Sequence, residues 1–130
     1  MKEKDIQSLM HKPLSNMKRT FFYELKLSKN PAKTVPFSKF ESQQLRSLLQ
    51  IKHSTLAMKI SDEDSRKKFG DGFVAYQEDS FVALCYYVPR QPKIVYFITI
   101  DEAIKLRESG KRSIHLNDAI GLHEFLIDLG

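Results

Sequence analysis

The sequence lacks several features that would place it in a common class of protein. It has a single cysteine, Cys85, in the apolar stretch 81–87, so no disulfide can form within the chain and a buried thiol is expected. No apolar run approaches the roughly 18 residues that a bilayer-spanning helix needs. The charged start, Met1 to Asp5, leads into no apolar segment of the signal-peptide kind. These absences predict a cytoplasmic protein without membrane association.

Motifs for common cofactors are also missing. The chain has neither a phosphate-binding loop of the Walker A kind nor the glycine pattern of dinucleotide-binding proteins. Its histidines are scattered, at His11, His53, His115 and His123. None of them has the spacing of metal ligands. The sequence therefore argues against P-loop nucleotide hydrolysis, dinucleotide chemistry and a histidine-based metal site.

Positive charge is concentrated in the first part of the chain. The net charge is +5. Residues 1–40 hold nine Lys and Arg against three Asp and Glu, whereas residues 41–130 hold twelve against thirteen, so the two parts carry +6 and −1. A basic patch of this kind attracts polyanions such as nucleic acid. An acidic protein partner and ordinary solvation of a small protein are the alternatives.

The hydrophobic pattern indicates one domain over residues 1–130 that mixes helices and strands. It predicts strands over 21–27, 55–60, 73–77, 81–87 and 93–99. It predicts helices over 4–14, from a cap at Ser38 to Lys52, over 101–108 and over 116–129. The expected fold class is therefore α/β, with a mixed central sheet of about five strands flanked by helices.

Two charges stand close together in the first predicted strand. Because side chains alternate along a strand, Glu24 and Lys26 share one face with Phe22, while Tyr23, Leu25 and Leu27 take the other. One explanation is a salt-bridged pair at a solvent-facing edge. The other is an active site, in which the carboxylate holds a divalent metal and the lysine positions water or stabilises charge on a phosphate.

Two further polar residues occupy positions that call for an explanation. Gln44 lies four residues from both Phe40 and Leu48, so its amide faces inward and must find partners, either a neighbouring backbone group or a site. Asp71, between two glycines, is either a turn residue or an acid at the mouth of the sheet. With Glu24, Asp71 would provide two carboxylates for a magnesium-type ion.

These residues resemble a known family. Glu24-Leu25-Lys26 looks like the (D/E)-X-K motif of the PD-(D/E)XK nuclease superfamily. Residues 35–49 are similar to the loop and helix that follow this motif in the bacterial and phage Holliday-junction-resolvase-like branch. That branch places a glutamine near the helix start, usually after a histidine, where this chain has Gln43. The later segments of the chain, 68–73, 81–87, 89–90 and 95–101, are similar to small phage and bacterial members of the branch.

The resemblance implies a restriction-endonuclease-like fold and a metal-dependent DNA endonuclease acting on branched DNA. It implies that Glu24, Asp71 and the backbone carbonyl of Leu25 bind Mg²⁺ or Mn²⁺. Lys26 would orient water or stabilise the transition state, and Gln44 would hold water or phosphate. It also implies a homodimer and contacts with the DNA backbone by Lys18, Arg19, Lys29, Lys33 and Lys39.

The order of the acidic residues departs from the superfamily pattern, in which the metal-binding aspartate precedes the E-X-K strand. Asp71 follows that strand, which implies a permuted arrangement. The acidic alternatives upstream are Glu3 and Asp5, both in the first predicted helix. Two other classes of function compete with the nuclease: a nucleic-acid-binding protein without metal chemistry, and a protein-interaction domain whose basic end binds an acidic partner.

Overall fold

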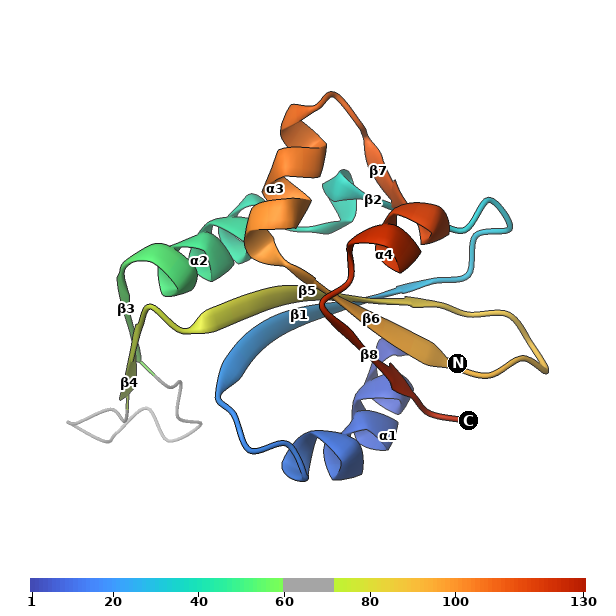
Figure 1. The fold of residues 1–130 in the computed structure, drawn as a ribbon, viewed down its shortest axis with the longest axis horizontal. Helices are drawn as coiled ribbons and strands as arrows, with labels where there is room; N and C mark the ends of the chain where they lie inside the picture. Colours follow the sequence, from blue (N-terminus) through green and yellow to red (C-terminus); the bar gives the residue numbers. More distant parts are fainter. Residues whose placement is uncertain (60–71) are drawn as a thin grey trace, which may run out of the picture.

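The structure, a computed structural model, describes residues 1–59 and 72–130 (Figure 1). The helices are α1 (Glu3–Ser15), α2 (Ser42–His53), α3 (Ile100–Glu108) and α4 (Leu116–Leu122), with a 3₁₀ turn, η1 (Phe37–Lys39), before α2. The strands are β1 (Phe21–Ser28), β2 (Thr34–Pro36), β3 (Thr55–Lys59), β4 (Gly72–Tyr76), β5 (Asp79–Tyr86), β6 (Ile94–Thr99), β7 (Ser113–His115) and β8 (Phe125–Asp128).

The central sheet has four strands in the order β1-β5-β6-β8. β1 runs parallel to β5, and the other two pairings are antiparallel. The predicted α/β class with a mixed sheet is confirmed, but the expected five strands become four. β3 and β4, which cover the described parts of the predicted strands over 55–60 and 73–77, do not enter the sheet, because among the described residues they pair only with each other. Val74 and Tyr76 of this hairpin are exposed, although residues of these types favour strands that are half buried.

The helix predicted over 116–129 is wrong in its second half. α4 ends at Leu122, and β8 follows as the fourth strand of the sheet. Phe125 stacks on Phe97 of β6, with ring centroids 4.4 Å apart, and Ile127 is buried. Phe125 and Ile127 are two residues apart, which is strand spacing. Ile120, which would lie on the inward face of the predicted helix, is 50% exposed in α4.

The start of α2 also differs from the prediction. The capping pattern predicts a helix start at Ser38, but this residue lies in η1, and Glu41 takes the capping position instead. Phe37, the first residue of η1, and Phe40, the residue directly after it, are buried. Burial of these two rings fixes the path of the chain ahead of α2, so the helix begins later than the capping pattern indicates.

Helices cover both faces of the sheet. α1 lies on one face, and α2, α3 and α4 lie on the other (Figure 1). Leu25 and Leu27 of β1 belong to the core beneath α1, whereas Phe22 packs against the core on the α2 side. The predicted division of β1 into two faces is thus confirmed, and Glu24 and Lys26 lie on the α2 side. No helix within the described ranges is long and apolar enough to cross a membrane.

Candidate active site

Glu24, Lys26 and Gln44 meet between β1 and α2. Gln44 Nε2 donates a hydrogen bond to Glu24 Oε1 at 2.9 Å. Lys26 Nζ lies 3.6 Å from the same oxygen. The other oxygen, Oε2, accepts no hydrogen bond from any residue that the structure describes. Three residues singled out in the sequence therefore form one cluster around a single carboxylate, with one oxygen left over for a ligand.

The cluster is sheltered but reachable from solvent. The side chain of Lys26 is 13% exposed and that of Glu24 is 32% exposed. The Lys26 ammonium also lies over the ring of Phe40, 5.6 Å from its centroid, which holds the cation in place by cation–π attraction. Lys26 is thus fixed beside Glu24 by two different interactions.

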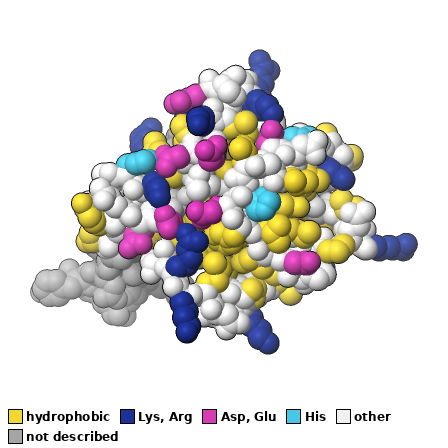
Figure 2. Space-filling view, in the orientation of Figure 1, with side chains coloured by type: hydrophobic (Ala, Val, Ile, Leu, Met, Phe, Trp, Pro, Cys, Tyr) yellow, Lys and Arg dark blue, Asp and Glu magenta, His cyan; other side chains and the backbone are white. Residues whose placement is uncertain are grey.

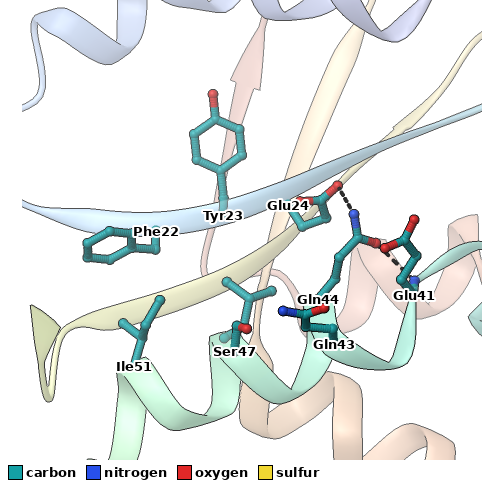
Figure 3. A pocket seen from close by; sticks show the side chains of 9 residues that line it. Phe22, Tyr23, Glu24, Glu41, Gln43, Gln44, Ser47 and Ile51 are labelled. Atoms are coloured by element: carbon teal, nitrogen blue, oxygen red, sulfur yellow. Dashed lines mark hydrogen bonds between the residues drawn. The ribbon is translucent and has the colours of Figure 1, made fainter. Parts of the chain in front are cut away.

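Gln44 has a second partner, in its own helix. Its carboxamide oxygen accepts the backbone N–H of Glu41 at 3.0 Å, while its Nε2 points to Glu24 (Figure 3). The backbone partner is the structural alternative raised from the sequence, and the bond to Glu24 is the functional one. Because the amide satisfies both, its orientation is fixed by the helix start and then presented to the carboxylate.

A hollow of about 280 Å³ adjoins the cluster. Its walls come from β1 and from one side of α2: Phe22, Tyr23, Glu24, Glu41, Gln43, Gln44, Ser47, Leu48 and Ile51. Sequence reasoning missed Ser47 as a lining residue. The sequence spacing could have predicted it, because positions 44, 47, 48 and 51 follow the helical period and share one side of α2. The hollow gives a ligand at Glu24 room beside the carboxylate.

The carbonyl of Leu25 points to the edge of β1 where no described strand is paired. The Ser28 carbonyl accepts the Tyr87 N–H, whereas the Leu27 N–H donates to Glu3 Oε1 at 3.3 Å. The N–H and C=O of one residue point to the same side of a strand, and this side alternates from residue to residue, so those of Leu25 and Leu27 point away from β5. Within the described ranges no strand pairs with β1 on that side. Leu25 as a whole is 4% exposed, so its carbonyl lies at this edge of β1 with little access to solvent.

The second acid of the predicted metal site is not fixed by this geometry. Asp71 lies outside the described residues. Of the upstream alternatives, Asp5 turns back to accept the Lys2 N–H at 2.7 Å. The Glu3 carboxylate reaches the edge of β1, where it accepts the Leu27 N–H. The Leu25 carbonyl points to the same edge, two residues earlier in the strand. No group of three or more His, Cys, Asp or Glu side chains is arranged for a metal ion in 1–59 and 72–130.

The chemistry of the donors fits a hard divalent cation. A carboxylate oxygen and a main-chain carbonyl are the oxygen ligands that Mg²⁺ accepts, and Mg²⁺ usually keeps several waters and needs only one or two carboxylates. Glu24 Oε2 and the Leu25 carbonyl belong to adjacent residues of β1. Such an ion would be held at this point of the strand, with Glu3 or Asp71 as the further acid.

The five predicted DNA-contacting residues have different surroundings. Lys18, Lys29 and Lys39 are exposed and form no ion pair with any described residue. Lys33 is half-buried, has a positive φ of 54° and accepts the Leu116 N–H with its carbonyl. Figure 2 shows acidic and basic side chains interleaved on the face in view, rather than one continuous basic patch.

The side chain of Arg19 has several partners in the protein itself. Its Nη2 lies 2.8 Å from Asp79 Oδ2 and 3.5 Å from Glu124 Oε2. The guanidinium also lies 5.5 Å from the ring centroids of three phenylalanines, at positions Phe21, Phe81 and Phe125. Arg19 thus joins the starts of β1, β5 and β8, and this structural role accounts for its presence without DNA.

Asp79 has a second cation beside it. Lys52 Nζ donates to Asp79 Oδ1 at 2.9 Å. This bond, together with the weaker effect of Arg19, lowers the pKa of the Asp79 carboxyl, although burial opposes the shift. The same bond raises the pKa of Lys52. The network ties the end of α2 to the start of β5 and thereby fixes the helix that carries Gln44.

No protein-family model matches the chain, and neither the curated proteins nor the solved structures contain a match. Function is therefore inferred from the residues themselves and from their geometry.

Proposed function

We propose that this protein is a metal-dependent DNA endonuclease of the resolvase-like kind. The observation that carries the proposal is the convergence of Lys26 and Gln44 on one oxygen of Glu24, beside a carbonyl at Leu25 that no described strand pairs with. A carboxylate, a lysine two residues later and a positioned amide are the groups that metal-assisted phosphodiester hydrolysis uses. The E-X-K resemblance and the basic first third of the chain point in the same direction.

Each residue has a role that follows from its position. Glu24 Oε2 and the Leu25 carbonyl would hold Mg²⁺ or Mn²⁺, which would supply Lewis-acid stabilisation of charge developing on the phosphate. Lys26, fixed over Phe40, presents its ammonium beside Glu24, where it stabilises a non-bridging phosphate oxygen or orients the attacking water. Gln44 holds the carboxylate in one orientation, so that Oε2 faces the ligand.

The substrate and the assembly are further parts of the proposal. Branched DNA and a C2 dimer that cuts two strands symmetrically follow from the resemblance. Lys18, Lys29, Lys33 and Lys39 would contact the DNA backbone. Such contacts fix the position of the duplex without reading its sequence.

A cleavage assay tests this function. Purified protein is incubated with Mg²⁺ or Mn²⁺ and either a labelled four-way junction or a linear duplex with the same arms. Symmetric junction cuts that disappear in Glu24→Gln and Lys26→Ala are expected. Comparing Asp71→Asn with Glu3→Gln then assigns the second acid, because only loss of the true ligand abolishes cutting. Wild-type protein that cuts neither substrate contradicts the proposal.

The second candidate is a nucleic-acid-binding protein without metal chemistry. The observation that favours it is that Glu24 already has two partners and that the described residues form no cluster of three metal ligands. In this case Glu24, Lys26 and Gln44 only join β1 to α2. Tight binding of the junction without any cutting, in either metal, is the result that selects this candidate.

A further inference from the structure

A second hollow lies on the other side of α2. It has a volume of about 230 Å³ and lies between α2 and α3, lined by Ser42, Leu45, Arg46, Leu49, Ile104 and Arg107. It shares no lining residue with the hollow at Glu24. Its polar lining consists of two arginines and a serine, with no carboxylate. This composition suits an anion.

Neither arginine has a partner among the residues that the structure describes. Arg46 and Arg107 are both exposed, and no ion pair or hydrogen bond engages either guanidinium there. This distinguishes them from Arg19, which has two carboxylates and three rings. Two unpaired guanidinium groups over one hollow repel each other, and a bound anion relieves that repulsion. Guanidinium also matches the geometry of phosphate oxygens through bidentate hydrogen bonds.

The start of α2 lies beside the two arginines. Ser42 is the first residue of this twelve-residue helix, but the N-cap residue before it is Glu41, whose carboxylate offsets the positive end of the helix dipole. The apolar remainder of the hollow is formed by Leu45, Leu49 and Ile104. The two arginines therefore supply the attraction for an anion.

We propose that Arg46 and Arg107, with Ser42, form a phosphate site for the backbone of a nucleic acid strand. The proposal rests on the proposed function, because it names a second point of contact for the same substrate. Gln44 and Ser42 lie on opposite sides of the same end of α2. A helix is about 10–12 Å across. At a rise of about 3.4 Å per nucleotide, a strand that crosses this end of α2 spans about three nucleotides between the Gln44 side and the Arg46 side of the helix.

The experiment measures DNA binding without metal, so it does not depend on cleavage. Fluorescence anisotropy of a labelled junction is followed over a series of KCl concentrations in the presence of EDTA. The proteins compared are the wild type, the double variant Arg46→Gln with Arg107→Gln, and Arg90→Gln. Arg90 is the matched control, because it is exposed in the turn between β5 and β6 and forms no ion pair with any described residue.

The double variant should bind DNA several-fold more weakly at low salt. The slope of log K against log salt should become shallower by about 0.7 to 0.9 for each phosphate that the variant no longer neutralises. Arg90→Gln should match the wild type. An unchanged slope in the double variant overturns the proposal, and so does tight binding of inorganic phosphate at these arginines with no change in DNA binding. A wild type that binds no DNA at low salt overturns it as well.

The two proposals fail in distinguishable ways. A shallower slope in the double variant, together with absence of cutting in Mg²⁺ and Mn²⁺, keeps the phosphate site and removes the endonuclease. Cutting that depends on Glu24, with an unchanged slope, keeps the endonuclease and removes the phosphate site.

Discussion

Gln44 Nε2 donates to Glu24 Oε1 at 2.9 Å while the oxygen of the same amide accepts the Glu41 N–H at 3.0 Å. One side chain thus completes the start of α2 and fixes the carboxylate on β1. Helix stability and site geometry are coupled at this residue. A change at Gln44 should therefore alter both, whereas a change at Glu24 should alter mainly the site.

Gln44→Ala should lower the free energy of unfolding by about 1 kcal/mol, since it removes an acceptor for an N-terminal N–H and a hydrogen bond to a charged group. Urea denaturation measures the change. Gln43→Ala is the control, because Gln43 is exposed and next in sequence, and its effect should stay within about 0.5 kcal/mol. Equal effects of the two substitutions would show that the Gln44 bonds contribute little.

Arg19→Gln should destabilise the protein by about 1–2 kcal/mol, because the guanidinium loses two carboxylates and its contact with three aromatic rings. Lys18→Gln, at the neighbouring exposed position, should leave the free energy of unfolding unchanged. DNA titrations of both variants complete the test. A folded, stable Arg19→Gln protein with greatly weakened DNA binding would assign Arg19 to the DNA surface instead.

The Asp79 network predicts a pH-dependent stability. The pKa of Asp79 is lower in the folded protein than the value of about 3.9 expected when unfolded. Its contribution is therefore present above the unfolded pKa and is lost as pH falls through the folded pKa. The side chain of Asp79 is 44% exposed, so solvent screening keeps the effect modest.

Urea denaturation from pH 7 down to about pH 2.5 measures this dependence on the Asp79 carboxylate. Asp79→Asn should be less stable than the wild type at pH 7, and the difference should shrink in acid. Glu108→Gln, at an exposed position without an ion pair among the described residues, should follow the wild-type curve. A difference between Asp79→Asn and wild type that stays constant over this range would rule out the ion pairs as its source.

Cys85 should resist alkylation in the folded protein. The thiol is fully buried in the core beneath α1, and burial raises its pKa to about 11. Burial keeps the reagent away from the sulfur, and the raised pKa keeps the fraction of reactive thiolate low. Iodoacetamide at about pH 8 should modify Cys85 only at urea concentrations that unfold the protein, as mass spectrometry would show. Rapid modification in buffer without urea would mean that local unfolding readily exposes Cys85 in β5 to solvent.

The sequence was most informative where side-chain spacing is tied to burial. The two faces of β1 and the inward position of Gln44 follow from the strand period of about 2 and the helix period of about 3.6 residues, and both are confirmed. The clustering of Glu24, Lys26 and Gln44 follows from these two facts. The short-range pattern was enough to predict this cluster, because only the short β2 and η1 separate β1 from α2 in the chain.

The prediction failed where short segments fit two structures. The end of the chain, from Leu116 to Leu129, has apolar residues at spacings that suit a helix and, from Phe125 on, a strand. Pairing with β6 decides between them, and that pairing is a long-range contact. Likewise, nothing local in the β3–β4 hairpin distinguishes a separate pair of strands from part of the central sheet. The partner of Arg19, Asp79, lies 60 residues away in sequence and could not be inferred.

A Mn²⁺ titration tests most directly whether Glu24 holds a divalent cation, and it assumes no substrate. Calorimetry or electron paramagnetic resonance would compare the wild type with Glu24→Gln and with Glu78→Gln, an acid outside the cluster. A metal ion on Glu24 predicts Mn²⁺ binding by the wild type and by Glu78→Gln, with at least a tenfold loss of affinity in Glu24→Gln, roughly 1.4 kcal/mol. Equal Mn²⁺ affinity in all three proteins, or no binding in any of them, would contradict the proposed metal site.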